Sequence, residues 1–166
     1  TIVIYDEAGL SSAPRVWWAF SAMGARDVRL LDGGAPAWRA EGRPTEAGAV
    51  QRAPRTFRPH LQPALVADFG AVRASLGSGA TTIIDARPAN RFRGEAPEPR
   101  PGLRSGHIPG SLSVPATDLV DGTRLRPVAE LKAVFDAAGV DLARPIVTSC
   151  GSGITASTLA LALRLA

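Results

Sequence analysis

Cys150 is the one cysteine of the sequence and the residue best suited to covalent chemistry. It follows residues 146–149, which have the pattern of a buried parallel strand, and it opens a loop with two glycines, residues 150–155. Glycines allow successive backbone N–H groups to turn inward, and the positive end of the following helix adds to their field. Such a loop favours the thiolate and stabilises a sulfur anion beside it. The alternative is a structural cysteine packed in the core, a common place for free cysteines.

Two other kinds of chemistry fit this loop less well. Cysteine phosphatases carry an arginine six residues after the cysteine, where it clamps phosphate oxygens, and Ala156 occupies that position here. One cysteine and two histidines, His60 and His107, are too few for a typical zinc cluster. We therefore expect no metal site, and any chemistry at sulfur has to use Cys150.

The composition is that of an ordinary globular protein. The 166 residues are 45% hydrophobic and 20% charged, which suits one domain or slightly more. The net charge is +4, but Lys132 is the only lysine and the arginines are scattered singly, so the sequence does not predict nucleic-acid binding. No apolar run reaches the roughly 20 residues of a membrane span, and no signal peptide is recognisable, which favours a cytoplasmic protein. The sequence begins with residues of a predicted strand and ends within a predicted helix, so we expect it to be a piece of a longer protein.

Strands and helices are predicted to alternate along the chain, which is typical of a parallel α/β sheet flanked by helices. Residues 46–63 contain three prolines and are predicted to form an extended linker, while 86–110 form a long loop of the kind that is often functional. Val72 and Leu76 are expected to face inward from one helix. The expected strands are 2–5, 28–31, 81–84, 112–114 and 146–149, and the expected helices begin near Pro14, surround Trp38, and span 66–76, 128–138 and 156–166.

An internal repeat is visible in two strand–loop–helix units. Residues 2–6 and 146–150 each form an apolar strand that enters a loop of small residues and then a helix, and Asp6 stands where Cys150 stands. If the repeat is real, one copy keeps a nucleophile and the other has lost it. The alternative is chance, because short patterns of this kind recur freely.

Five segments match the motifs of one known family, in the same order along the chain. They are Ser12–Trp18, Leu31–Gly34 with Trp38, Asp85–Phe92 with Pro97–Arg100, Gly106–Gly110, and Cys150–Ala156. In this order, the segments resemble the inactive first repeat, the last strand and helix of a rhodanese repeat, the substrate loop, the signature turn and the active-site loop of 3-mercaptopyruvate sulfurtransferases, in the tandem-rhodanese family. The resemblance implies a rhodanese-like fold in two repeats. Residues 1–45 would be the second half of an inactive N-terminal repeat, 46–64 a linker, and 65–166 a catalytic C-terminal repeat without its last strand and helix.

The resemblance also implies a mechanism without metal or organic cofactor. Cys150 attacks the outer sulfur of 3-mercaptopyruvate, pyruvate leaves, and the cysteine carries a persulfide. A thiol, such as a small thiol or a thioredoxin-like protein, or cyanide then takes the sulfur. Ser152 matches a serine that assists proton transfer, although its Asp and His partners in the family lie in a part of the N-terminal repeat that has no counterpart here.

Substrate-binding roles are implied for two arginines and for the loop itself. Arg91 and Arg100 match the arginines that hold the carboxylate and carbonyl of the substrate, a role suited to a planar fork of donors. The alternative is a pair of solvated loop arginines. The loop residues expected to contact substrate are Gly151, Gly153, Ile154 and Thr155.

Three residues near these arginines in the sequence are expected to have structural rather than catalytic roles. Asp85 and Arg87 are expected to brace the substrate loop, and His107 is expected to belong to a structural turn rather than to act in catalysis.

The donor preference follows from the charge of the cysteine loop. Thiosulfate-preferring relatives carry basic residues directly after the cysteine, whereas Gly151 and Ser152 are neutral, which favours 3-mercaptopyruvate. Two alternatives remain: a thiosulfate:cyanide sulfurtransferase, and a non-catalytic rhodanese-like carrier that hands persulfide sulfur to a partner.

Overall fold

The computed structural model describes residues 1–166. Helices and strands alternate along most of the chain, and no helix is long and apolar enough to cross a membrane. The elements are β1 (Ile2–Ile4), α1 (Ala13–Ala22), β2 (Val28–Leu30), α2 (Gly34–Ala40), α3 (Phe69–Ser75), β3 (Thr82–Asp85), α4 (Ala89–Phe92), β4 (Leu112–Ser113), β5 (Val120–Asp121), β6 (Arg124–Leu125), α5 (Val128–Ala137), β7 (Ile146–Ser149) and α6 (Ile154–Leu165).

The larger sheet has three parallel strands in the order β4-β3-β7. Asp85 at the end of β3 lies opposite Ser149 at the end of β7, so the carboxyl ends of both strands meet at one edge. Cys150 follows β7 directly and therefore lies at this edge, where parallel sheets usually bind ligands. The core beneath the sheet includes Ile84, Val114, Leu119, Leu131, Phe135 and Leu159.

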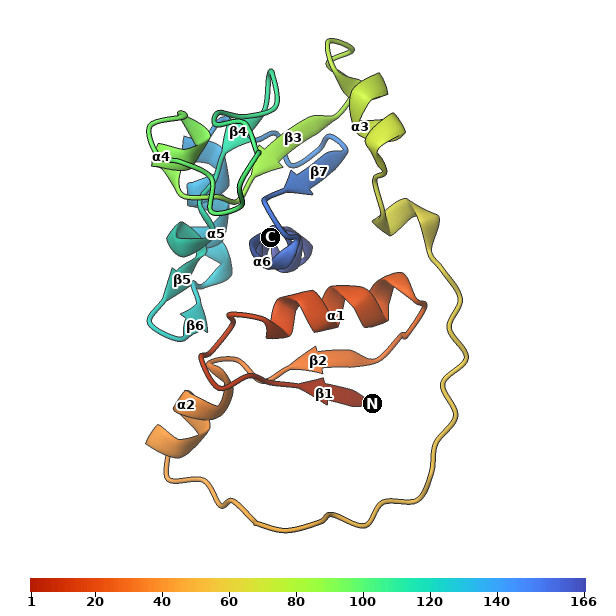
Figure 1. The fold of residues 1–166 in the computed structure, drawn as a ribbon. Coiled ribbons are helices and arrows are strands. Elements are labelled where there is room, and N and C mark those ends of the chain that lie inside the picture. The colour runs from red at the N-terminus through yellow and green to blue at the C-terminus, as the bar shows by residue number, and fades with distance from the viewer.

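A second, smaller parallel sheet is formed by β1 and β2, with Ile2 opposite Val28. α1 joins the two strands and lies between this sheet and α6 (Figure 1). Pro14 stands in the first turn of α1, where its fixed φ suits a helix start, and small buried residues such as Ala13 and Ala22 line the helix. As a result, α1 packs on the helix that follows Cys150.

Residues 41–62 contain no helix or strand and run around the outside of the molecule (Figure 1). The end of this segment is fixed on α1 by backbone hydrogen bonds, from the His60 N–H to the Met23 carbonyl (2.9 Å) and from the Gln62 N–H to the Ala22 carbonyl (2.7 Å). Residues 46–62 of the predicted linker thus contain no helix or strand, and Pro63 opens a short 3-10 helix, Pro63–Leu65.

A polar bridge joins the β5–β6 hairpin to the N-terminal residues. The Arg124 guanidinium pairs with Asp32 (3.3 Å) and with Glu41, and the Leu125 N–H donates to the Asp32 carboxylate (3.2 Å). The two sheets are therefore tied together at the hairpin as well as through α1 and α6.

Most predicted elements are confirmed, with four differences. Helix α3 is shorter than the predicted 66–76 and buries no residue. Leu76 lies just after it in extended backbone and is 39% exposed, so the prediction that Leu76 faces inward was wrong. α6 begins at Ile154 rather than 156, and the loop 86–110 contains the one-turn helix α4. The β5–β6 hairpin was not predicted, although Asp121-Gly122 is a known turn signal, and Gly122 has the positive φ (57°) that such turns require.

Candidate active site

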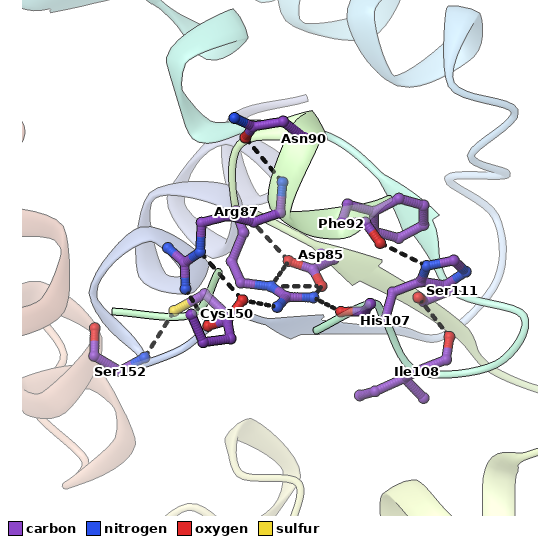
Figure 2. A network of polar contacts seen from close by, with 12 residues as sticks. Asp85, Arg87, Asn90, Phe92, His107, Ile108, Ser111, Cys150 and Ser152 are labelled. Carbon is purple, nitrogen blue, oxygen red and sulfur yellow. Dashed lines mark hydrogen bonds and ion pairs between the residues drawn. The ribbon is translucent and has the colours of Figure 1, made fainter. Parts of the chain in front are cut away.

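Cys150 lies in a backbone cradle between β7 and α6. Its Sγ accepts hydrogen bonds from the backbone N–H groups of Gly153 (2.9 Å) and Ser152 (3.4 Å). Figure 2 shows the contact with Ser152 beside the polar network of the neighbouring loop. Gly153 has a φ of 83° and directly precedes the first residue of α6, so a glycine at this position gives the loop its tight turn. The arrangement expected from the sequence is therefore present.

The environment of Cys150 lowers the pKa of its thiol. Partial burial raises this pKa, because burial disfavours the charged form, but hydrogen bonds act in the opposite direction and outweigh it. These come from the Thr155 hydroxyl and from the backbone N–H groups of Ser152, Ala156 and Gly153. The net shift favours the thiolate, which is the nucleophilic form of cysteine.

Arg91 reaches the cysteine loop from helix α4. Its Nη2 lies 3.2 Å from the point that a Cβ on Gly151 would occupy, so the guanidinium covers this part of the loop. The same guanidinium donates from Nε and Nη2 to the two carboxylate oxygens of Glu98. Two of the five N–H groups of Arg91 are used by Glu98, which leaves three for another partner.

Arg87 holds the segment 85–106 together. Its guanidinium bonds to Asp85 (2.6 Å), to Glu98 (2.7 Å) and to the backbone carbonyl of Gly106 (2.7 Å), as Figure 2 illustrates for Asp85. The Asp85 side chain is only 4% exposed and Arg87 11%, so this ion pair is buried. The predicted bracing role of both residues is confirmed. Glu98 joins Arg87 to Arg91 and thereby links the brace to the cysteine loop.

His107 belongs to a structural turn, as expected. Its Nδ1 lies 2.7 Å from the Phe92 carbonyl oxygen, and its ring stacks on the Phe92 ring with centroids 3.8 Å apart (Figure 2). These contacts join the turn to α4, the helix that carries Arg91.

The remaining predicted residues differ in how close they lie to Cys150. Thr155 and Ile154 form the first turn of α6, where Ile154 is 40% exposed and Thr155 is half-buried. Ser152 is exposed and contacts the sulfur through its backbone N–H rather than its hydroxyl. Arg100 is exposed, outside any helix or strand, and it forms no hydrogen bond or ion pair. The structure thus brings Arg91 to the loop and leaves Arg100 free on the surface.

A known protein family matches most of the chain. The rhodanese-like domain matches residues 1–41 and 69–166, which include the cysteine loop and the N-terminal residues. The chain belongs to the rhodanese family.

Individual relatives of this rhodanese chain are sulfurtransferases. It is 43% identical over 164 residues to the 3-mercaptopyruvate sulfurtransferase of Homo sapiens and 38% identical over 167 residues to the thiosulfate sulfurtransferase of Gallus gallus. Its structure is similar to the crystal structure of SseA, a 3-mercaptopyruvate sulfurtransferase from Escherichia coli, with a TM-score of 0.85 and 41% identity. The predicted resemblance to this family is confirmed.

The match covers nearly all of the rhodanese chain but only part of each relative. The match to the human protein includes 96% of the chain and 55% of that protein. The match to the chicken protein includes 99% of the chain and 57% of that protein, and the match to SseA includes 98% of the chain and 60% of SseA. The chain therefore spans somewhat more than half the length of these relatives.

Two charged residues of the site are not apparent from the sequence alone. Glu98 lies inside the motif Pro97–Arg100, but only the structure shows that its carboxylate accepts hydrogen bonds from both Arg87 and Arg91. Arg15 also lies inside a quoted motif, and its guanidinium contacts the cysteine loop at Gly153. No pattern in the sequence reports either contact, because each joins segments that are brought together only by the fold.

Proposed function

We propose that this rhodanese chain transfers sulfur from 3-mercaptopyruvate to an acceptor through a persulfide on Cys150. The thiolate forms an S–S bond with the donor sulfur, and the C–S bond of the donor breaks. The electron pair of that bond leaves with the carbon as the enolate of pyruvate, which takes up the proton from the donor thiol. Cys150 is left as a persulfide anion, and a thiol or cyanide then removes its outer sulfur.

The geometry of Cys150 is the observation that carries this proposal. Its Sγ accepts two backbone N–H groups at the start of a helix, and hydrogen bonds hold the pKa of its thiol below the ordinary value. The same donors favour a negative charge on sulfur, which both the attacking thiolate and the persulfide carry. A cysteine packed for structure alone has no need of such a cradle.

Substrate binding is assigned to groups on both sides of the sulfur. Arg91, with three unused N–H groups over Gly151, would bind the substrate carboxylate in the geometry that suits a guanidinium. Arg100, which is exposed and unpaired, would close on the substrate carbonyl from the same loop. The neutral residues Gly151, Gly153, Ile154 and Thr155 would line the space around the sulfur, and Ser152 would assist proton transfer through its free hydroxyl.

We also propose that residues 1–45 and 65–166 are parts of two related repeats joined by the linker 46–64. The support is local: Asp6 after β1 and Cys150 after β7 each accept backbone N–H groups from a loop that opens a helix. The proposed location is the cytoplasm, and the proposed partners are a small-molecule donor and a thiol acceptor, without nucleic acid or membrane.

The test is the mass of the intact protein after incubation with 3-mercaptopyruvate. We expect a gain of one sulfur atom that is absent in Cys150→Ser and is removed by cyanide or by a thiol. Arg91→Met is expected to reduce the gain at low donor concentration because it removes a charge-assisted contact. If the mass of the wild-type protein does not change with any donor, the proposal is contradicted. That result would favour a chain that only receives sulfur from the persulfide of a partner.

A further inference from the structure

Glu98 holds the Arg91 guanidinium along one of its edges. The Nε and Nη2 groups of Arg91 donate to the two carboxylate oxygens of Glu98, which is the bidentate arrangement of an arginine with a carboxylate. The same Nη2 atom lies 3.2 Å from the point that a Cβ on Gly151 would occupy. Nη2 keeps one N–H and Nη1 keeps two, so a second edge, between these two nitrogens, remains open. This open edge begins at the atom that contacts the cysteine loop.

Glu98 is itself fixed to the edge of the larger sheet. Its side chain is buried, and its Oε1 also accepts a hydrogen bond from Arg87 Nη1 (2.7 Å). Arg87 in turn pairs with Asp85, the last residue of β3 (Figure 2). Asp85 lies opposite Ser149, the residue directly before Cys150. A continuous series of ion pairs therefore runs from the strand beside β7 to the guanidinium over the cysteine loop.

The ion pairs of this series differ from all others in the molecule. Their side chains are at most 22% exposed, whereas every other ion pair has side chains that are at least 37% exposed. A buried ion pair is weak evidence of stability, because the loss of hydration offsets the attraction, but it does fix the geometry of its charged groups. An arginine side chain has much freedom to lose, and no other side chain bonds to the Arg91 guanidinium. Its orientation therefore depends on Glu98.

The edge of Arg91 that binds a carboxylate determines where the rest of the ligand lies. Each edge of a guanidinium can bind a carboxylate through two parallel hydrogen bonds. We propose that Glu98 is a positioning residue, which closes one edge of Arg91 so that the donor carboxylate binds only at the open edge, beside Gly151. This inference rests on the proposed binding of the donor carboxylate by Arg91.

Without the charge of Glu98 the donor would have two ways to bind. The released guanidinium can turn and offer its second edge, and a carboxylate bound there takes the place that the Glu98 carboxylate holds now, beside Arg87. Only the arrangement at the open edge, next to Gly151, brings the donor sulfur to Cys150. The second arrangement increases total binding but does not react, so it lowers the maximal rate and the half-saturating donor concentration by the same factor.

The experiment follows persulfide formation on Cys150 in a single turnover, by intact mass after rapid quenching, over a range of 3-mercaptopyruvate concentrations and without acceptor. Each variant then has a maximal rate and a half-saturating concentration. Glu98→Gln removes the charge and keeps the shape of the side chain. In this variant we expect both quantities to fall by at least about threefold, while their ratio stays within about twofold of wild type.

Three further variants accompany Glu98→Gln. Glu98→Asp keeps a charge opposite Arg87 but reaches less far toward Arg91, so intermediate values are expected. Glu95→Gln is the matched control and should match wild type, because Glu95 accepts from Nε and Nη2 of Arg93 in the same bidentate way, but in an exposed pair. Arg91→Met should raise the half-saturating concentration, since it removes the proposed carboxylate contact.

The outcomes separate this inference from the proposed function. A wild-type chain that takes no sulfur from 3-mercaptopyruvate contradicts the proposed function, and an unchanged half-saturating concentration in Arg91→Met removes the basis for a role of Glu98. If both behave as expected, unchanged kinetics or a higher half-saturating concentration in Glu98→Gln overturns the inference alone. A large fall in the ratio of the two quantities would show that Glu98 only supports the fold, and an equal change in Glu95→Gln would show a general effect of charge; both overturn it. If Glu98→Gln does not fold, Glu98→Asp decides by the same criteria.

Discussion

Asp6 and Cys150 each lie between a strand and a helix, and the side chain of each accepts hydrogen bonds from backbone N–H groups. The Asp6 carboxylate accepts the N–H groups of Ser12 (2.7 Å) and Ala13 (2.8 Å) at the start of α1. The Cys150 sulfur accepts those of Ser152 and Gly153 at the start of α6. At α1 a carboxylate accepts the backbone N–H groups at the helix start, whereas at α6 the acceptor is a sulfur that can react.

Asp6→Ala should destabilise the fold by about 1 kcal/mol, because it leaves N–H donors at the start of α1 without a partner. The measurement is the midpoint of urea unfolding. Asp68→Ala is the matched control: Asp68 also accepts a helix N–H, from Ala71, but its helix α3 buries no residue. We expect the control to leave the midpoint nearly unchanged, and equal effects of both substitutions would contradict this account.

The rate of alkylation of Cys150 should rise with pH around a midpoint below that of a free cysteine, because hydrogen bonds lower the pKa of its thiol. Thr155→Val removes the hydroxyl that contributes to this shift, so the midpoint should move up and the rate at neutral pH should fall roughly two- to tenfold. Iodoacetamide kinetics from pH 5 to 10 measure the midpoint. Thr158→Val, one turn further along α6, is expected to leave it in place. An unchanged midpoint in Thr155→Val would show that the backbone donors alone set the thiol pKa.

The sequence predicts the parts of the site that depend on neighbours along the chain. β7, the glycine-containing loop after it and the helix that follows are all short-range features, so the place of Cys150 could be anticipated from residues 146–155 alone. The length and composition of residues 86–110 indicate a functional loop, but they do not reveal the contacts inside it. Arg91 was assigned from a motif, whereas its partner Glu98 depends on how that loop closes.

Contacts between distant segments could not be predicted from local patterns. Arg15 meets Gly153 only because α1 packs on α6, and the apolar spacing of a helix does not say which other helix it contacts. Leu76 illustrates the opposite error, since a helical apolar pattern suggested burial and the fold provides no surface to cover it. Periodicity predicts which face of an element is apolar, and the tertiary fold decides whether that face is buried.

Gly153→Ala should impair the cysteine loop more than a glycine substitution elsewhere. Its backbone has a φ of 83°, which costs about 1–2 kcal/mol for an alanine, and the new Cβ would lie 2.9 Å from Arg15 Nη1. Gly139→Ala is the control, because its φ is 74° but nothing lies within 4 Å of the new Cβ. We expect similar losses of stability, and a larger loss of sulfur transfer in Gly153→Ala because the backbone N–H of Gly153 donates to the sulfur of Cys150. Equal transfer rates in the two variants would contradict the assignment of the Gly153 backbone to the support of the Cys150 sulfur.

Glu98→Gln should destabilise the fold at neutral pH and have less effect in acid. A hydrogen bond from Arg91, aided by the charges of Arg91 and Arg87, holds the pKa of Glu98 below its usual range despite the opposing effect of desolvation. A carboxyl group with a lowered pKa stabilises the folded state fully above its unfolded pKa of about 4.3, and this contribution is lost as the pH falls through the folded pKa.

The difference in urea midpoint between wild type and Glu98→Gln is therefore expected to be largest above about pH 5 and to shrink below about pH 4. Glu46→Gln, in the exposed linker and without an ion pair, is expected to match wild type at every pH. A constant difference between wild type and Glu98→Gln down to pH 3 would mean that shape rather than charge makes Glu98 important. Because Glu98 occupies two donors of Arg91, the same variant should also lower the KM for 3-mercaptopyruvate, since the freed guanidinium can bind the substrate carboxylate with both.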